Sequence, residues 1–462
     1  MLGMLFNSYE FIFVFLPITI GVYFSLAKKH WIKAATMWLF IASLAFYSYW
    51  NILYLPLLLL SICFNFIMGK KIEARRTKVL LAFGVGFNLL LLGYFKYAGF
   101  FVSSLNMITG NGFIVPQIIL PLGISFFTFT QTAYLIDAYR GETNKYSFLT
   151  YALFVTVFPH LIAGPILHHK DMIPQFSRLR TFVVNYKNIA IGICMFTIGL
   201  FKKAVIADTF APWVGLAFDH ADKLTFVEAW CGALAYTFQL YFDFSAYSEM
   251  AIGLGLMFNL TLPINFNSPY KSTSIIEFWS RWHITLSSFL KNYLYIPLGG
   301  NRHGELKKMR NLLFTMLLGG LWHGAGWTFV IWGGLHGIYL IINHQWRKCG
   351  IILPKLINRM LTFVAVVVAW VFFRAESVQD AIAIISAMGN IETITLQGLD
   401  FVKQNEYGWI LGMLLVTMYC KNTQERLVNF RAGWKWLIVV VIMFAYVIID
   451  LNKNTEFLYF QF

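Results

Sequence analysis

The fold of this chain is decided by residues 278–337, which read FWSRWHITLSSFLKNYLYIPLGGNRHGELKKMRNLLFTMLLGGLWHGAGWTFVIWGGLHG. Beyond Arg310 this stretch is apolar and contains no Asp, Glu, Lys or Arg. His323 lies within the apolar part, between Trp322 and Gly324. An ionisable side chain is costly in such a segment and marks a functional site by default. We therefore take His323 as the chemical centre and ask what the rest of the chain builds around it.

The composition around this centre is that of a membrane protein. The chain has 462 residues, of which 58% are hydrophobic and only 12% are charged, whereas soluble domains carry about 25% charged residues. The many long apolar runs predict an all-α, polytopic membrane protein. The first run, residues 11–27, has no basic region before it and no small-residue cleavage site after it. It therefore reads as a retained span and not as a removed signal.

The net charge of +15 would suggest nucleic-acid binding in a soluble protein. Here Lys and Arg cluster in the short connections between apolar runs, as KKHWIK at 28–33 and KKIEARRTK at 70–78. Such connections face the cytoplasm by the positive-inside rule. We therefore expect no nucleic acid as partner, and both termini outside the cell.

A span needs roughly 20 mainly apolar residues, and this length predicts how the chain is divided. The segment at 149–168 is interrupted by Pro159 and by Ala-Gly-Pro at 163–165, which is tolerated only where protein or a water-filled cavity covers the backbone. Residues 275–290 predict an amphipathic helix. The other expected spans are 11–27, 34–50, 52–69, 79–95, 188–206, 224–242, 357–373, 406–420 and 434–450, with a shorter apolar helix at 246–260.

The depth of His323 follows from the apolar run before it. Residues 311–321 would form a helix of about 16 Å, which cannot cross a hydrocarbon core of about 30 Å. The Trp-His-Gly-Ala-Gly sequence at 322–326 is therefore expected at mid-depth, inside a cavity. Beyond it the chain either continues outward or turns within the protein.

Three histidines could carry chemistry, and each has a structural alternative. His323 fits a general base, since imidazole titrates near neutral pH; the alternative is a histidine that hydrogen-bonds across helices. His283 could orient a carbonyl or stabilise an oxyanion, or merely belong to a polar helix face. His336 lies 13 positions past His323, about 220° around a helix, so the two would face apart unless Gly333 and Gly334 break it. We favour a structural role for His336.

The five cysteines form no CxxC pair and no metal spacing. Free cysteines are commonly buried as small hydrophobes, and we expect that here, in or near the spans. No metal is predicted.

Residues 454–462 stand apart from the expected membrane domain at 1–453. FLYFQF at 457–462 places four aromatic rings in six residues, which would be an aggregation hazard in water. The segment could anchor at the membrane interface. Alternatively it folds back into an outer cavity and brings Tyr459 toward His323, where a phenol beside a base can act as a nucleophile.

Several longer motifs support a family resemblance. They include YFKYAGFF at 94–101, PLGISFFTFTQTAYLIDAYRGE at 121–142, AGPI at 163–166, GLFKKAVIAD at 199–208, YFDFSAYSEMAIGLGLMFNLTLPINFNSPY at 241–270 and WVFFRAES at 370–377. With the stretch at 278–337, they make the chain resemble the membrane-bound O-acyltransferase family. Within it, the chain is similar to the membrane subunit of bacterial alginate-type polysaccharide O-acetyltransferases.

The resemblance implies a fold and a set of site residues. The fold is a ring of roughly 11–13 transmembrane or partly inserted helices around a central cavity, with an extracellular funnel. His323 matches the catalytic histidine of the family, and His283 stands where many relatives have Asn. The residues expected to bind substrate are Arg281, Trp282, Trp322 and Asp243.

The resemblance also implies a reaction. An acetyl group passes from a cytoplasmic thioester, acetyl-CoA, to the outside, where a serine-nucleophile partner enzyme of the SGNH type places it on a polysaccharide. FLYFQF is similar to the aromatic hexapeptide of a small protein in D-alanyl transfer to teichoic acid, which implies that Tyr459 is a transient acyl carrier. The alternatives are D-alanyl, lipid or protein O-acylation by the same family, or a transporter with intramembrane histidines.

Overall fold

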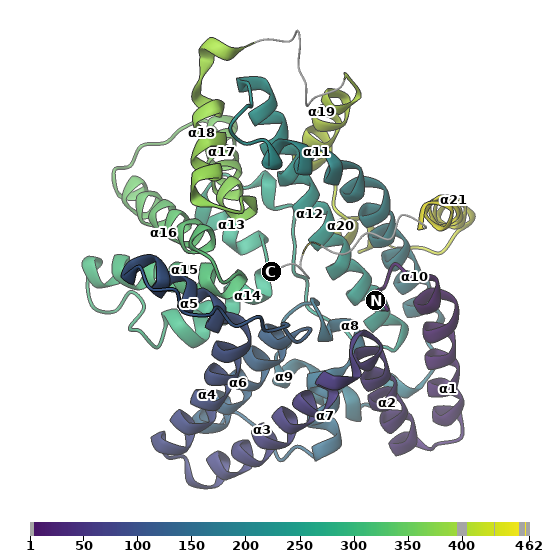
Figure 1. Cartoon of the computed structure of the whole chain (residues 1–462). Helices are drawn as coiled ribbons and strands as arrows, with labels where there is room; N and C mark the ends of the chain where they lie inside the picture. Colours follow the sequence, from purple (N-terminus) through teal and green to yellow (C-terminus); the bar gives the residue numbers. More distant parts are fainter. Residues whose placement is uncertain (1–3, 395–403, 429, 452–457, 459–462) are drawn as a thin grey trace. The chain divides into compact units, whose positions relative to one another are not determined.

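The computed structural model describes residues 4–394, 404–428, 430–451 and 458, and their regular structure is helical throughout (Figure 1). The chain divides into two compact units. Unit 1 comprises residues 1–200, 247–263 and 431–456, and unit 2 comprises residues 201–246, 264–430 and 457–462.

Six helical segments of the described residues are long and apolar enough to cross a membrane. Six of the expected spans fall within them. Large apolar side chains point outward from these helices, among them Val79 at 79% and Leu90 at 76% exposure, as lipid contact requires. The protein is therefore a multi-pass helical membrane protein. The six segments are Glu10–Lys28, Ile32–Trp50, Ile52–Arg75, Lys78–Thr109, Tyr186–Asp219 and Lys355–Arg374.

Unit 1 contains the amino-terminal helices, shown in purple and blue in Figure 1. A short π-helix, Glu10–Phe15, leads into the first α-helix, and α4 and α5 continue one another through a second π-helix at Gly93–Tyr97. The expected span at 79–95 is thus part of a longer helical run. The helices of this unit are α1 (Leu16–Lys28), α2 (Ile32–Trp50), α3 (Leu55–Arg75), α4 (Lys78–Leu92), α5 (Ala98–Thr109), α6 (Ile124–Arg140), α7 (Phe148–Thr156), α8 (Phe158–Leu161), α9 (His169–Met172), α10 (Tyr186–Phe201, with its last residue in unit 2) and α21 (Trp434–Asp450).

Helices α3, α4 and α6 of unit 1 pack closely because small and polar residues lie at their contacts. A Cβ at Gly69 would lie 2.3 Å from the ring of Tyr134, so only glycine lets α3 approach α6 here. The buried amides of Asn65 and Asn88 donate to each other's oxygen atoms at 3.0 and 2.7 Å. Such pairs join helices where water cannot.

The expected span at 149–168 is interrupted, as its proline and glycine predict. α7 ends at Thr156, and the four-residue α8 follows. A Cβ at Gly164 would lie 2.4 Å from the Cα of His160, so the chain folds tightly on itself. These residues are almost fully buried, which supplies the cover that a broken helix needs at membrane depth.

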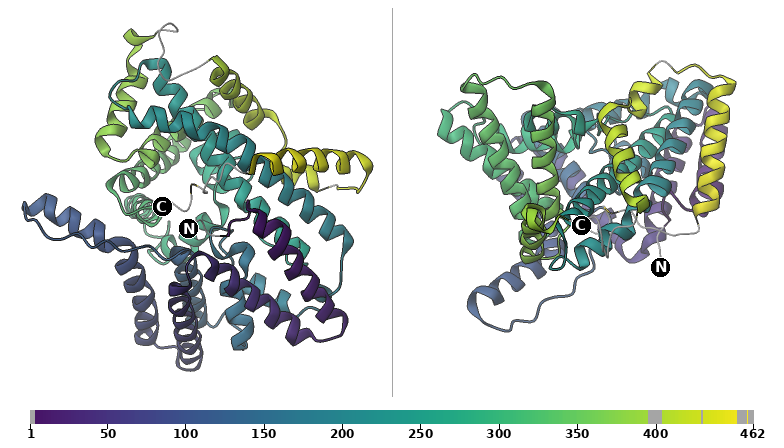
Figure 2. Two further views of the ribbon diagram at one scale, coloured as in Figure 1. Left: turned by 45° about the vertical axis from the view of Figure 1, so that its right-hand side comes forward. Right: turned by 90° about the horizontal axis from the view of Figure 1, so that it is seen from above.

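Unit 2 is built around a helical hairpin. α15 (Glu305–His323) and α16 (Trp327–Lys348) lie against one another, as the right-hand view of Figure 2 shows. Their backbones nearly touch, since a Cβ at Gly320 would lie 2.2 Å from the carbonyl oxygen of Phe329. Residues 324–326 make the turn, with Gly324 and Gly326 extended. Of the two expected routes, the chain therefore takes the one that turns within the protein.

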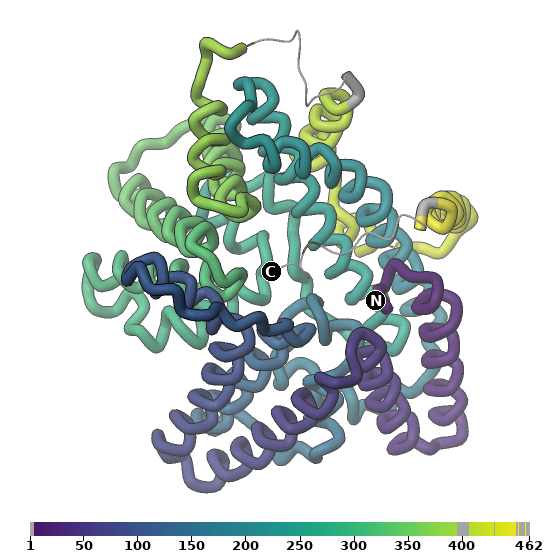
Figure 3. Tube along the Cα trace, viewed as in Figure 1, coloured from purple at the N-terminus to yellow at the C-terminus, as the bar shows by residue number. Residues whose placement is uncertain are grey.

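The remaining helices of unit 2 can be followed along the trace in Figure 3. They are α11 (Asp208–Asp219), α12 (Phe226–Met257, whose last turns belong to unit 1), α13 (Ile275–Arg281), α14 (Ile284–Leu290), α17 (Lys355–Arg374), α18 (Val378–Gly389), α19 (Gln404–Tyr419) and α20 (Thr423–Leu427). Five of them, α11, α12, α13, α17 and α18, share with this hairpin a cluster of buried apolar side chains, which Ile410 of α19 also joins.

Three expectations about helix boundaries were wrong. The segments at 224–242 and 246–260 form the single helix α12, because no proline or glycine separates them. The segment at 275–290 is two helices, with a break at His283. α15 begins at Glu305 and not at the apolar residue 311, because its first turns carry basic residues that hydropathy alone assigns to a loop.

The expectation that the cysteines are buried is correct for only two of them. Cys194 and Cys231 are buried, whereas Cys63, Cys349 and Cys420 are exposed. Cys63 lies on α3, one of the candidate spans, and there faces away from the packed side of the helix.

Candidate active site

His323 is the last residue of α15 and lies in an aromatic cage in unit 2. Its side chain is buried, with 5% of the residue exposed. Its ring centre lies 5.0 Å from that of Trp322, 5.1 Å from that of Trp332 and 5.3 Å from that of Phe373. α15 stops here because Gly324 is extended and its amide bonds back only weakly to Gly320, at 3.4 Å.

His283 is the second buried imidazole of this site. Its ring centre lies 6.2 Å from that of His323, and the residue is fully buried. With φ at 43°, its backbone is left-handed, a region that side-chain-bearing residues rarely adopt and that tends to occur at functional sites. This conformation breaks the helix between α13 and α14 and turns the ring toward the end of α15.

The break at His283 is braced by the segment at 265–267. The Ile284 amide donates to the Asn265 carbonyl oxygen, and the Asn267 amide donates to the Arg281 carbonyl oxygen, both at 2.9 Å. The side-chain oxygen of Asn265 accepts from the Thr285 amide at 3.2 Å and from its hydroxyl at 2.9 Å. It also lies 3.1 Å from His283 Nδ1. That nitrogen must therefore carry the hydrogen, which leaves Nε2 as the proton acceptor of the neutral ring.

His336 lies behind His323 and not on the same helix. Its Nδ1 accepts from the Trp279 indole N–H at 3.2 Å, and the residue is fully buried. The Trp332 ring lies between the two histidines, with its centre 5.1 Å from that of His323 and 4.9 Å from that of His336. The expectation that the two rings face apart around one helix does not apply, because α15 ends before α16 begins.

The tryptophans expected to bind substrate have different surroundings. Trp322 is buried beside both catalytic candidates, with its ring centre 6.2 Å from that of His283. Trp282 packs instead against Trp370 and Phe266, at 4.9 and 5.0 Å. The structure therefore brings Trp322, but not Trp282, into contact with the two histidines.

Arg281 lies in an ion pair on the surface of unit 2. Its guanidinium contacts the Glu277 carboxylate at 2.9 Å and donates to the Asn267 carbonyl oxygen at 3.1 Å. Burial raises the pKa of Glu277, but hydrogen bonds from Thr273 and the charge of Arg281 outweigh it and lower the pKa. The Arg281 side chain therefore links α13 to the segment at 265–267, beside His283. Its expected contact with substrate stays a prediction.

Asp243 lies on α12 in a buried ion pair with Lys203. The lysine nitrogen is 2.9 Å from Asp243 and 2.7 Å from Asp208. Both members of the first pair have side chains only 2% exposed. The other oxygen of Asp243 accepts from the Leu458 amide at 3.1 Å. Asp243 thus bonds to the backbone of Leu458. Phe244, the residue after Asp243, packs on His283 with ring centres 4.8 Å apart.

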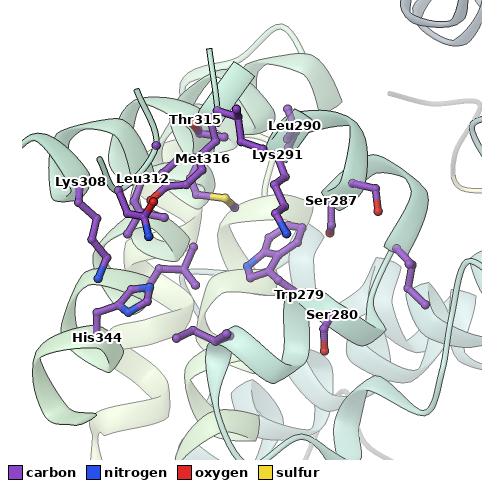
Figure 4. A pocket seen from close by; sticks show the side chains of 18 of the residues that line it. Trp279, Ser280, Ser287, Leu290, Lys291, Lys308, Leu312, Thr315, Met316 and His344 are labelled. Atoms are coloured by element: carbon purple, nitrogen blue, oxygen red, sulfur yellow. The ribbon is translucent and has the colours of Figure 1, made fainter. Parts of the chain in front are cut away.

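A cavity of about 750 Å³ opens in unit 2 near this site. Figure 4 shows Trp279, Lys291, Lys308 and His344 among the side chains that line it. Three basic side chains (Lys291, Arg302 and Lys308) line it, and none of its lining residues is acidic. His323 does not line it, but Trp279 does, and the Trp279 ring packs against Trp332 with centres 5.9 Å apart.

The sequence profile of the membrane-bound O-acyltransferase family matches residues 44–373 of the chain, which include the two facing histidines. The chain belongs to the membrane-bound O-acyltransferase family. It is accordingly an enzyme, a membrane-bound acyltransferase.

The relatives of this acyltransferase cover different shares of the chain. It is 42% identical to the peptidoglycan O-acetyltransferase of Helicobacter pylori, over 99% of this chain and 98% of that protein. It is 45% identical to the probable alginate O-acetylase of Pseudomonas aeruginosa, over 89% of this chain and 80% of that protein. The teichoic acid D-alanyltransferase of Streptococcus thermophilus is 28% identical, over 49% of this chain and 57% of that protein.

Three residues of this candidate site were not predicted from the sequence. Asn265 orients His283, Lys203 neutralises Asp243, and Trp332 separates His323 from His336. A signal existed for Lys203, since GLFKKAVIAD places a lysine within an apolar run. Tyr459, the third expected catalytic residue, lies outside the described residues.

Replacing Asn265 by alanine is expected to lower the thermal stability of the acyltransferase and its transfer rate together. The His283 ring and the Thr285 amide would lose their common acceptor, and an unsatisfied buried donor costs about 1–3 kcal/mol. The rate should fall at least about tenfold because the His283 ring is no longer held. Thermal unfolding and acetyl transfer are measured on the purified protein. Asn265→Asp keeps the acceptor oxygen and should lose less; a wild-type rate for Asn265→Ala would contradict the positioning role.

Proposed function

We propose that the protein is an O-acetyltransferase that takes an acetyl group from acetyl-CoA at the cytoplasmic side. It delivers this group to the outside, for O-acetylation of a cell-surface or secreted polysaccharide. The observation that carries the proposal is the pair of buried imidazoles, His323 and His283, with ring centres 6.2 Å apart. The relatives named for O-acetylation of peptidoglycan and alginate support the acyl group and the class of acceptor.

The reaction needs a base and a means to stabilise negative charge. His323 removes the proton of the attacking hydroxyl, whose oxygen bonds to the thioester carbonyl carbon. The carbon–sulfur bond then breaks, and the thiolate leaves and takes up the proton. His283 supports the charge on the carbonyl oxygen. Because Nδ1 of His283 is committed to Asn265, this support requires a proton on Nε2 as well.

The cavity of 750 Å³ is the donor site in this proposal. Its volume falls in the usual range of ligand pockets, about 300–1,000 Å³. Its lysines and arginine suit the phosphate groups of acetyl-CoA, and basic connections face the cytoplasm. Trp279 forms part of its wall and packs against Trp332, which in turn contacts His323. The rings of Trp279 and Trp332 therefore connect this cavity to His323.

Reversing the charge of Lys291 and Lys308 tests this donor site. The double variant Lys291→Glu/Lys308→Glu should raise the KM for acetyl-CoA by about tenfold or more, which corresponds to about 1.4 kcal/mol of binding. kcat should change little, since neither side chain lies at the histidines. The exposed Lys355→Glu serves as the control. A donor KM equal to that of the control would rule out this cavity as the donor site.

The outer half of the proposal concerns the carboxy-terminal aromatic segment. The bond from the Leu458 amide to Asp243 supports its return to unit 2, where Leu458 joins the buried apolar cluster. Tyr459, the next residue, would accept the acetyl group on its phenol oxygen. A serine-nucleophile partner of the SGNH type outside the cell would then collect it, with both termini of this chain on that side and lipid around the spans.

A second candidate is D-alanyl transfer, favoured by the similarity to teichoic acid D-alanyltransferases. The two differ in the acyl group, so purified protein offered labelled acetyl and D-alanyl thioesters should distinguish them. Transfer of D-alanine alone would replace the acetyl proposal. Acylation of a lipid or protein is a further possibility within the family and would show as label in those fractions.

A further inference from the structure

Unit 1 contains a second cluster of histidines, which the acyl transfer does not use. Asp137, near the end of α6, is fully buried, and His168 and His169 converge on it. Both contact the same carboxylate oxygen through Nε2, at 2.8 and 3.0 Å. The sequence predicted no metal site, because its cysteines lack metal spacing and an aspartate distant from a histidine pair gives no signal.

The three side chains present a recognisable donor set. Their ligand atoms all lie within 4.8 Å of one another. Two imidazole nitrogens and one carboxylate oxygen are ligands that zinc and similar ions accept. With metal–ligand bonds of about 2.0–2.2 Å, the ligand atoms of a tetrahedral site lie about 3.3–3.6 Å apart. Each histidine Nε2 would therefore have to move away from the Asp137 oxygen by a few tenths of an ångström, from 2.8 and 3.0 Å, to admit an ion.

Neighbouring side chains hold His169 and Asp137 in place, as the hydrogen-bonding partners of metal ligands commonly do. The Tyr146 hydroxyl lies 2.9 Å from His169 Nδ1, the ring nitrogen that faces away from Asp137. Metal-bound histidines commonly keep such a partner on the second nitrogen. Arg140 contacts the other carboxylate oxygen of Asp137, at 3.5 Å. The oxygen that faces both histidines is therefore the one that would bind a cation together with their Nε2 atoms.

We propose that Asp137, His168 and His169 bind one divalent metal ion of the zinc class. The ion would join the end of α6 to α9, which follows the broken helical segment α7–α8. With three protein ligands, the fourth position falls to water, and the His168 side chain is 32% exposed and gives water access. The site is separate from the acyl-transfer histidines, which belong to unit 2.

The test is metal content of the full-length protein, purified in detergent through a tag without histidines. After zinc is added and excess removed by dialysis, mass spectrometry should find about one zinc per chain. His168→Asn and Asp137→Asn should each lose the zinc at least tenfold. His30→Asn is the matched control, because His30 is an exposed histidine at φ 60°, where asparagine is well tolerated.

Cobalt offers a second readout that does not depend on activity. Cobalt bound by the wild type and by His30→Asn should give a visible absorption band of a four-coordinate site, absent in His168→Asn. Tyr146→Phe should keep the site but weaken metal affinity about 10–100-fold. Folded wild-type protein that binds neither metal, or His168→Asn that binds as well as the control, would overturn the proposal. The cluster would then be a hydrogen-bonded network only.

Discussion

Replacing His323 by glutamine is expected to lower acetyl transfer by about 10²–10⁴-fold, the usual contribution of a general base. Glutamine fills most of the imidazole volume and so preserves contact with Trp332 and Phe373, but it cannot take the proton. His323→Ala should lose the activity as well. Transfer of labelled acetyl from acetyl-CoA by membranes containing equal amounts of each variant is the measurement.

The control for this result is His336→Gln. His336 is as deeply buried as His323 and also contacts Trp332, but it lies away from the end of α15 and accepts a hydrogen bond from Trp279. We expect it to reduce stability while transfer stays within about tenfold of wild type. If His323→Gln retained activity, or if both variants lost it equally at equal stability, His323 could not be the specific base.

Much of the fold follows from patterns that are local in the sequence. Length and apolarity suffice for spans such as Ile32–Trp50, because each helix satisfies its own backbone in lipid. The break after Thr156 follows from Pro159 and the glycine after it. The merger of two expected segments into α12 could not be predicted from hydropathy, because Asp243, the charged residue between them, is buried by packing against other parts of the chain.

The candidate site was predictable where it contains ionisable side chains, because such side chains cost free energy in an apolar segment. His323 and His283 were selected as candidates because an ionisable imidazole is rare in an apolar segment. Their approach to 6.2 Å depends on the left-handed backbone at His283 and on Asn265, which are tertiary features without a local pattern. The expected contact of Asp243 with substrate stays a prediction, and its observed partners, Lys203 and the backbone of Leu458, could not be predicted from a local pattern.

The second large effect is expected from Tyr459→Phe. Phenylalanine keeps the aromatic ring of the segment that follows Leu458 but removes the phenol oxygen that would attack the thioester carbonyl. Polysaccharide O-acetylation in cells should fall to the level of a strain without this protein. Acetyl-labelled wild type should carry the label on the peptide that contains Tyr459, found by mass spectrometry after incubation with labelled acetyl-CoA. The exposed Tyr419→Phe should behave as wild type.

The possible outcomes separate the carrier role of Tyr459 from the acetyl transfer itself. Full acetylation of the polysaccharide by Tyr459→Phe would contradict the carrier role and leave the His323 chemistry intact, with the acceptor hydroxyl attacking directly. If the wild-type peptide carries the label and both Tyr459→Phe and His323→Gln lose it, then acylation of the Tyr459 phenol requires His323. Because Asp243 holds the adjoining backbone at Leu458, Asp243→Ala should slow the labelling of Tyr459 without removing its phenol.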